Sequence, residues 1–300
     1  MTAILLRPDQ PLDLDRTLSC GQAFRWEVVD GWWNGVVGEE AIRIRQDGNR
    51  LLFSGADAQF IHDYLRLDQD LPSILASIDR DPVIGAAIRE CTGLRLVRQP
   101  PWECLVSYIC ATNTNIPAVK RRIALMAERY GRPIEGPFGR AYAFPEPDAL
   151  AELSCTDLRD CKVGYRADAV REAALYAAEN PDWAERIAAL PFEEAREALM
   201  HFRGIGPKAA DCVLLFAFGF FEAFPVDVWI HRIVTEAYLP ELAGKGCTPA
   251  VYERIRKFAQ EYFGDYAGYA QEYLYCVRER GMQKMVKPPF LNPATRQNSR

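Results

Sequence analysis

The stretch Phe202–His231, FRGIGPKAADCVLLFAFGFFEAFPVDVWIH, decides the fold of this chain. Gly204 and Gly206 predict a tight turn, and Pro207 suits the first position of the helix that follows, where its missing N–H costs no hydrogen bond. Backbone N–H groups at such a glycine turn bind phosphate. The pattern predicts a helix-hairpin-helix that holds a nucleic-acid backbone, although a turn that merely joins two helices has the same glycines.

Lys208 opens a helix that is apolar on nearly all sides, so we expect this helix to be buried. The helix dipole and partial desolvation both disfavour an ammonium there, and covalent lysine catalysis requires a neutral amine. Asp227 follows 19 residues later, at the N-cap of the next predicted helix. The pair predicts a nucleophile faced by a carboxylate. The alternatives are a lysine that only contacts phosphate and an aspartate that only caps its helix.

The N-terminal third has the pattern of a sheet, and the rest has the pattern of helices. Residues 20–55 contain the hairpin turns Asp30-Gly31 and Asp47-Gly48-Asn49, whereas apolar residues recur at helical spacing from Pro101 onward. We therefore predict an α+β protein. It comprises an N-terminal antiparallel β-sheet domain with short helices (residues 1–95), an all-helical domain containing the helix-hairpin-helix motif (residues 96–286) and a disordered tail (residues 287–300).

The composition is that of an ordinary globular protein, with 49% hydrophobic and 26% charged residues among 300. No apolar run reaches the roughly 20 residues of a membrane span, and we see no secretory signal. We expect a monomer in the cytoplasm or nucleus, with no membrane partner. The nine cysteines form no C-x-x-C pair, so we expect free, mostly buried thiols and no metal or cofactor.

The net charge of −5 argues mildly against nucleic-acid binding, but a local basic patch is what binds phosphate. Two basic clusters are candidates for such a patch, and each could equally be a solvated helix face. They are Lys120-Arg121-Arg122 and a C-terminal group of Arg278, Arg280, Lys284 and Lys287.

Five separated segments resemble those of a known family and together span residues 12–280. They are Cys20–Trp26, Gly93–Asn115, Val163–Arg166, Phe202–Asp227 and Tyr266–Gln271. The chain resembles the 8-oxoguanine DNA glycosylases of the helix-hairpin-helix superfamily. The resemblance implies a bifunctional DNA glycosylase and AP lyase that removes 8-oxoguanine, and formamidopyrimidine guanine, from double-stranded DNA in base excision repair. Unlike endonuclease-III-like members, the chain has no C-terminal four-cysteine cluster.

The resemblance implies a role for each matching residue. Lys208 would attack C1′ of an extruded nucleotide and form a Schiff base that permits β-elimination, because C1′ is shielded within the duplex. Asp227 would stabilise positive charge at the sugar and help with proton transfers.

The implied base pocket has four members. Cys212 and Tyr275 would lie against the two faces of the base, and Gln271 would bind its Watson–Crick edge. The carbonyl of Gly21 would accept a hydrogen bond from N7–H, which guanine lacks. Without the resemblance, Cys212, Gln271 and Tyr275 could each be ordinary packing residues.

Two further residues match positions that contact the DNA around the lesion. Asn113 would fill the gap left by the extruded base, and Arg166 would read the orphaned cytosine. The chain departs from the animal-type pattern at Ala118, where a second arginine belongs, and at Trp229, where a histidine is common. Ala118 has no side-chain donor, so we predict a weaker preference for cytosine opposite the lesion.

Two other functions remain open on the sequence. A glycosylase for another damaged base is disfavoured by Lys208, because monofunctional members lack this lysine. A non-catalytic DNA-binding scaffold would leave the pairing of Lys208 with Asp227 unexplained.

Overall fold

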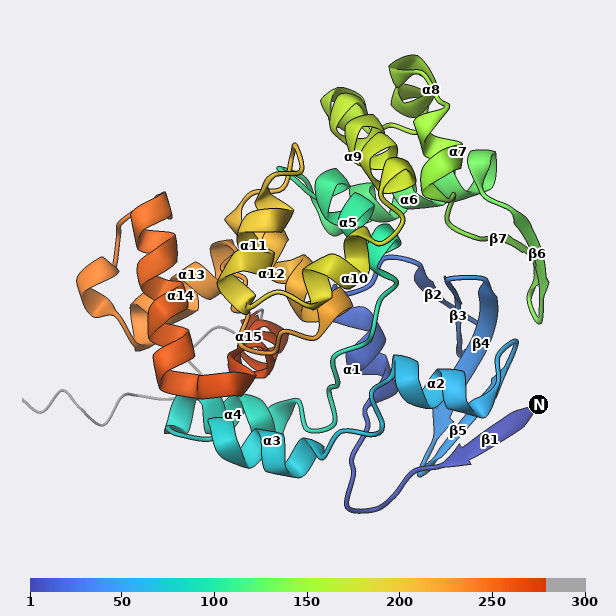
Figure 1. The fold of residues 1–300 in the computed structure, drawn as a ribbon. Coiled ribbons are helices and arrows are strands. Elements are labelled where there is room, and N and C mark those ends of the chain that lie inside the picture. The colour runs from blue at the N-terminus through green and yellow to red at the C-terminus, as the bar shows by residue number, and fades with distance from the viewer. Residues whose placement is uncertain (279–300) are drawn as a thin grey trace, which may run out of the picture.

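The computed structural model describes residues 1–278 and contains a five-stranded antiparallel sheet followed by a helical assembly (Figure 1). The strands lie in the order β1-β5-β4-β3-β2. The predicted hairpin turns at Asp30-Gly31 and Gly48-Asn49 join β2 to β3 and β4 to β5. The strands are β1 (Thr2–Leu5), β2 (Trp26–Val29), β3 (Trp32–Val37), β4 (Glu40–Asp47) and β5 (Arg50–Ser54).

Short helices accompany the sheet in sequence, as predicted, although α1 was not expected. They are α1 (Leu14–Ser19), α2 (Ala58–Tyr64), α3 (Leu71–Ile78) and α4 (Pro82–Glu90). Helices α1 and α2 belong to the core under the sheet, whereas α3 and α4 contribute to the core of the helical part. The division of domains at residue 95 stays a prediction.

The remainder of the described chain is helical apart from one small hairpin of strands β6 (Pro133–Gly136) and β7 (Gly139–Tyr142). This hairpin was not predicted, and Ala141 packs it against Val36 and Ala41 of the main sheet. The helices are α5 (Pro101–Cys110), α6 (Ile116–Tyr130), α7 (Pro147–Ala151), α8 (Cys155–Asp160), α9 (Ala167–Glu179), α10 (Trp183–Ala188), α11 (Phe192–Met200), α12 (Pro207–Val213), α13 (Val228–Ala237), α14 (Pro249–Phe263) and α15 (Ala267–Cys276).

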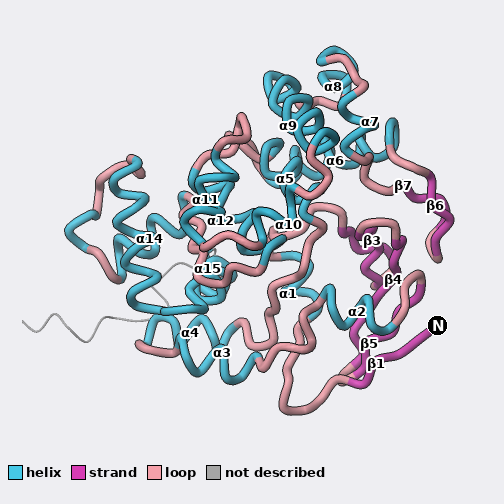
Figure 2. The backbone as a smooth tube through the Cα atoms, viewed as in Figure 1, coloured by secondary structure: helices cyan, strands magenta, loops and turns pink. Residues whose placement is uncertain are grey.

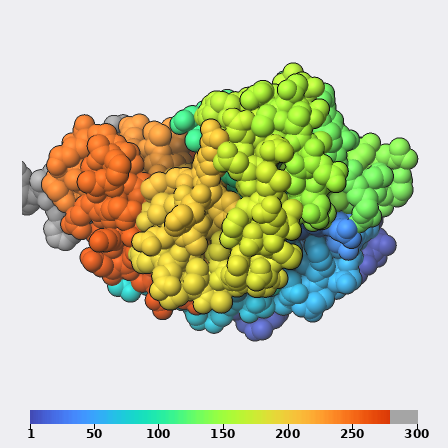
Figure 3. Space-filling view, turned by 45° about the horizontal axis from the view of Figure 1, so that its top comes forward, coloured from blue at the N-terminus to red at the C-terminus, as the bar shows by residue number. Residues whose placement is uncertain are grey.

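The strands gather at one end of the molecule and the helices fill the rest (Figure 2). The two parts are in direct contact, and the helical part makes up most of the face seen in Figure 3. The predicted α+β fold is therefore confirmed. No helix within residues 1–278 is long and apolar enough to cross a membrane. The predicted tail, 287–300, and the basic residues Arg280, Lys284 and Lys287 lie outside the described residues.

Two cysteines are not free, which corrects the prediction of free thiols. Cys91 and Cys276 form a disulfide that joins the end of α4 to the end of α15. They lie 185 residues apart in sequence, and only the packing of α15 on α4 brings them together. The other seven cysteines are free, and five of these are buried.

Candidate active site

The predicted hairpin turn joins α11 to α12. Gly204 has a φ of 87°, a conformation that favours glycine, and Gly206 is the N-cap of α12. Both glycines are exposed, and no atom lies within 4 Å of the position that a Cβ of Gly206 would occupy. The turn therefore has the open backbone that a phosphate contact requires.

Helix α12 ends at Val213, where the chain continues into a π-helical turn, Leu214–Phe218. Single π-helical turns are frequent at functional sites. Pro207 occupies the first turn of α12, as predicted, and Lys208 follows it at the helix start, half-buried. The Nζ of Lys208 lies 5.2 Å from the ring centroid of Tyr108 on α5, an arrangement that favours the ammonium.

Asp227 lies where the sequence predicts, at the N-cap of α13. Its carboxylate accepts a hydrogen bond from the backbone N–H of Ile230 at 2.8 Å, so the side chain is held in one direction. The same carboxylate is close enough to Lys208 to raise the pKa of the amine. The structure therefore places Asp227 near enough to Lys208 to act on its charge, and this role is compatible with capping α13.

The expectation of a neutral amine at Lys208 is wrong for the resting site. Burial lowers the pKa of Lys208, but Cys212 and Asp227 act in the opposite direction and outweigh it, so the pKa lies above its ordinary value. Sequence reasoning weighed the helix dipole and burial without the neighbouring groups. Lys208 rests as an ammonium and must lose a proton before it can act as a nucleophile.

Helix α15 carries Gln271 and Tyr275, one turn apart, and the intervening Glu272 is close enough to Cys212 to act on its thiol. The side chain of Gln271 is buried, and its Oε1 has no hydrogen-bond partner. Burial raises the pKa of Tyr275 to about 12 and that of Cys212 to about 11, so both are protonated at neutral pH. An unsatisfied buried amide oxygen calls for a ligand that donates a hydrogen bond.

Gly21 lies against this pocket. Its φ is 98°, and a Cβ added there would stand 2.9 Å from Cδ1 of Ile116 and 4.0 Å from Cε1 of Tyr275. The next residue, Gln22, is fully buried and hydrogen-bonds to the backbone of Thr17, Arg95 and Val97. Gln22 thus fixes the loop that presents Gly21.

Asn113 and Arg166 meet on another side of the site. Asn113 is exposed with a φ of 49°, in the turn between α5 and α6. The buried guanidinium of Arg166 donates hydrogen bonds to the carbonyls of Thr112 and Asn113 and lies over the ring of Tyr165. Arg166 therefore supports this turn, and contact with an orphaned base would require it to swing outward.

The basic cluster on α6 is tied to the protein backbone. Lys120 donates to the carbonyl of Trp26, and Arg122 donates to the carbonyls of Cys110 and Lys162. Lys120 and Arg122 therefore stabilise the fold through these hydrogen bonds in addition to carrying positive charge.

Two family models match the chain in succession. Residues 4–105 match the 8-oxoguanine DNA glycosylase N-terminal domain, and residues 106–262 match the HhH-GPD superfamily of base excision DNA repair proteins. The chain belongs to the 8-oxoguanine DNA glycosylase family. This agrees with the resemblance found in the sequence.

Relatives of this family align over nearly the whole chain. The N-glycosylase/DNA lyase OGG1 of Arabidopsis thaliana is 28% identical over 94% of this chain and 81% of its own length. The solved structure of MBOgg1 with a low-affinity DNA ligand has 33% identity and a TM-score of 0.84, and covers 93% of this chain and 96% of its own. The 8-oxoguanine glycosylase/lyase of Clostridium acetobutylicum, in complex with double-stranded DNA containing cytosine opposite 8-oxoG, has 30% identity and a TM-score of 0.83, and covers 90% and 92%.

Sequence reasoning missed a buried ionic network behind α12 of this glycosylase. Asp211, next to Cys212, is fully buried and accepts hydrogen bonds from Arg196 at 2.7 Å and from the hydroxyl of Tyr252. Burial raises the pKa of Asp211 to about 6. The only sequence signal was a charged residue in an otherwise apolar helix, and the network anchors α12 to α11 and α14.

Sequence reasoning also missed Glu272, which follows Gln271 on α15. The side chain is only 4% exposed, and its Oε2 is buried without a hydrogen-bond partner. Burial raises its pKa to about 7. In the sequence, the one feature that could have pointed to Glu272 was its position next to Gln271.

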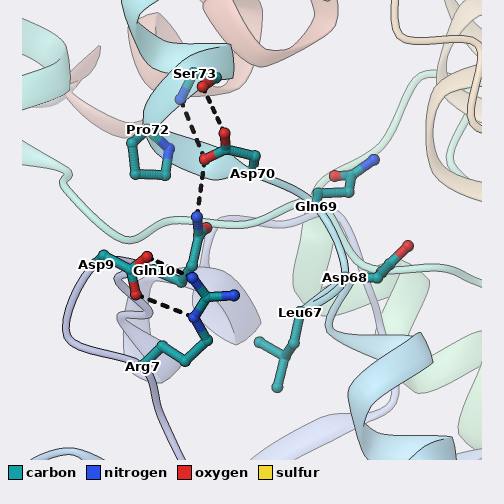
Figure 4. A pocket seen from close by; sticks show the side chains of 9 residues that line it. All are labelled: Arg7, Asp9, Gln10, Leu67, Asp68, Gln69, Asp70, Pro72 and Ser73. Carbon is teal, nitrogen blue, oxygen red and sulfur yellow. Dashed lines mark hydrogen bonds and ion pairs between the residues drawn. The ribbon is translucent and has the colours of Figure 1, made fainter.

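A separate surface pocket of about 440 Å³ lies between the segment after β1 and the start of α3 (Figure 4). Its rim carries an exposed ion pair of Arg7 with Asp9, and Gln10 binds Asp70 across it. None of the predicted site residues lines this pocket. Its polar, open walls have no buried reactive group, so it is not the active site.

Proposed function

We propose that this DNA glycosylase/AP lyase removes 8-oxoguanine from double-stranded DNA through attack of Lys208 on C1′ of the extruded nucleotide. The class of enzyme follows from its family. The proposed attack of Lys208 on C1′ depends on one observation. The amine of Lys208, at the start of α12 beside an open glycine turn, is faced by the carboxylate of Asp227 from α13. Attack gives a Schiff base, and β-elimination then cleaves the strand.

In this proposal the turn at Gly204 and Gly206 holds a backbone phosphate, which places the sugar beside Lys208. Asp227 stabilises the positive charge that develops at the sugar as the base leaves. Its hydrogen bond from Ile230 keeps the carboxylate aimed without a rearrangement.

The base would lie between Cys212 and Tyr275, with the free Oε1 of Gln271 accepting from its Watson–Crick edge. The carbonyl of Gly21 would accept the N7–H of 8-oxoguanine. Guanine would oppose this carbonyl with a lone pair and leave it unpaired, at a cost of about 1–3 kcal/mol. Formamidopyrimidine guanine also bears a donor on the matching nitrogen, so we propose it as a second substrate.

Around the lesion, Asn113 would enter the gap in the stack, and Arg166 would turn toward the orphaned base. Ala118 provides no second donor, because its own backbone N–H is used by the cap residue Asn115. We therefore propose relaxed discrimination of the opposite base. Excision rates opposite C, A, G and T test this, and a strict requirement for cytosine would contradict it.

Trapping with borohydride tests the nucleophile. The wild type is expected to form a covalent adduct with duplex DNA containing 8-oxoguanine, and Lys208→Gln is expected to form none. Lys257→Gln, the same change at an exposed lysine on α14, is the matched control and should trap like the wild type. An adduct with Lys208→Gln would refute the assignment, and binding without cleavage by the wild type would favour a scaffold.

We also propose that the enzyme acts as a monomer, because one chain supplies every group of the proposed site. Its DNA substrate is the reason to propose that it works in the cytoplasm or nucleus. Sedimentation with and without DNA tests the monomer.

A further inference from the structure

Glu272 is a buried carboxyl group that the proposed steps do not use. It lies on α15 between the base-pocket residue Gln271 and the core residue Tyr273, and its Oε2 is enclosed without a partner. Nearly all buried polar side-chain atoms in folded proteins are hydrogen-bonded. An enclosed carboxyl with a free oxygen is therefore costly to keep, and its presence beside the active site calls for a role.

The surroundings of Glu272 are the active site itself. The thiol of Cys20, next to Gly21, lies within hydrogen-bonding reach of its carboxylate. The charge of Glu272 also acts on groups from four elements. These groups are Tyr108 on α5, Lys208 and Cys212 on α12, Asp227 on α13, and Tyr275 with the adjoining Arg278 at the end of α15.

We propose that Glu272 accepts the proton that Lys208 must lose before it attacks C1′. This inference rests on the proposed nucleophilic role of Lys208 and adds a residue to that reaction. Lys208 is the nucleophile and starts as an ammonium, so some group must take its proton. The partly exposed Asp227 accepts the N–H of Ile230 through Oδ1, whereas the Oε2 of Glu272 is enclosed in the site and has no hydrogen-bond partner.

The acidity of Glu272 suits this task. Burial raises its pKa to about 7, where a carboxylate is both present at neutral pH and basic enough to take a proton. An incoming base would expel water from the pocket. Loss of water disfavours the separated charges of ammonium and carboxylate relative to the neutral amine and carboxylic acid. Substrate entry would thus itself promote the transfer.

The step balances without an outside reagent. One N–H bond of Lys208 breaks, its proton bonds to Oε2 of Glu272, and the freed electron pair on Nζ forms the bond to C1′. The C1′–N9 bond breaks, and its electron pair leaves with the base. The departing base takes up one proton from the Glu272 carboxylic acid, directly or through water, which restores the carboxylate.

Single-turnover excision of 8-oxoguanine as a function of pH tests the proposal. For the wild type, the rate is expected to fall as the pH drops below about 7, because a protonated Glu272 cannot accept a proton. Glu272→Gln keeps the shape of the side chain but cannot take a proton at these pH values. It is expected to be slower by roughly 10²-fold and to lose the acidic limb of the profile. Glu194→Gln, the same change at an exposed position on α11, is the control.

Each outcome decides the matter. A Glu272→Gln variant that is slow but keeps the acidic limb would show only a structural role, and one with the wild-type rate would overturn the proposal outright. If this variant does not fold, the wild type decides, since a flat profile below about pH 8 contradicts the proposal. If Lys208→Gln still excises 8-oxoguanine, both the proposed function and this inference fail. If Lys208→Gln is inactive but the pH profile of Glu272→Gln matches that of the wild type, only this inference fails.

Discussion

Replacement of Glu272 by glutamine is expected to stabilise the folded protein at alkaline pH. Burial raises the pKa of Glu272 from 4.5 to about 7, so the folded state resists ionisation of a group that ionises freely when the chain unfolds. The protonated Glu272 therefore contributes stability that is fully present below about pH 4.5. This stability is lost as the pH rises through about 7, the pKa of Glu272 in the folded state. At 1.36 kcal/mol per pKa unit, the loss amounts to about 3 kcal/mol by pH 8.

Urea unfolding of the wild type and Glu272→Gln at a series of pH values measures this loss. The difference in the free energy of unfolding is expected to change by about 2–3 kcal/mol between pH 5 and pH 8, in favour of the variant at the higher pH. The exposed control Glu194→Gln should differ from the wild type by less than about 0.5 kcal/mol at every pH. A difference between wild type and Glu272→Gln that does not vary with pH would refute the reasoning, because it would mean that Glu272 ionises equally well in the folded state.

Three further predictions follow from other contacts. Gly21→Ala places a side chain at a φ that disfavours it, so it should lower stability by about 1–3 kcal/mol and abolish excision, measured by urea unfolding and single-turnover cleavage. Arg196→Met leaves the buried carboxylate of Asp211 without its cation and should cost about 3–5 kcal/mol in the free energy of unfolding, whereas a cost below about 1 kcal/mol would contradict the network. Reduction of the disulfide between Cys91 and Cys276, which closes a loop of 185 residues, should lower the free energy of unfolding by about 5 kcal/mol, and no effect of reductant on the urea midpoint would argue against the bond.

Local patterns predicted most of the fold. The hairpin turns, the glycine turn before α12 and the cap at Asp227 depend on neighbouring residues, so they are visible in the sequence. The edge strand β1 and the hairpin of β6 and β7 were missed, because four-residue strands carry too short a pattern and are defined by their partners.

The active site likewise has one part that the sequence predicts and another that only the tertiary structure decides. The sequence by itself determined the amine, its carboxylate and their places on α12 and α13, because motifs record local geometry. The tertiary structure alone decided that Lys208 rests as an ammonium, that Cys91 meets Cys276, and that Oε2 of Glu272 is enclosed without a partner among the reactive groups. A pKa, a disulfide and a buried charge all depend on atoms that are distant along the chain and come together only when α15 packs against α4 and α13.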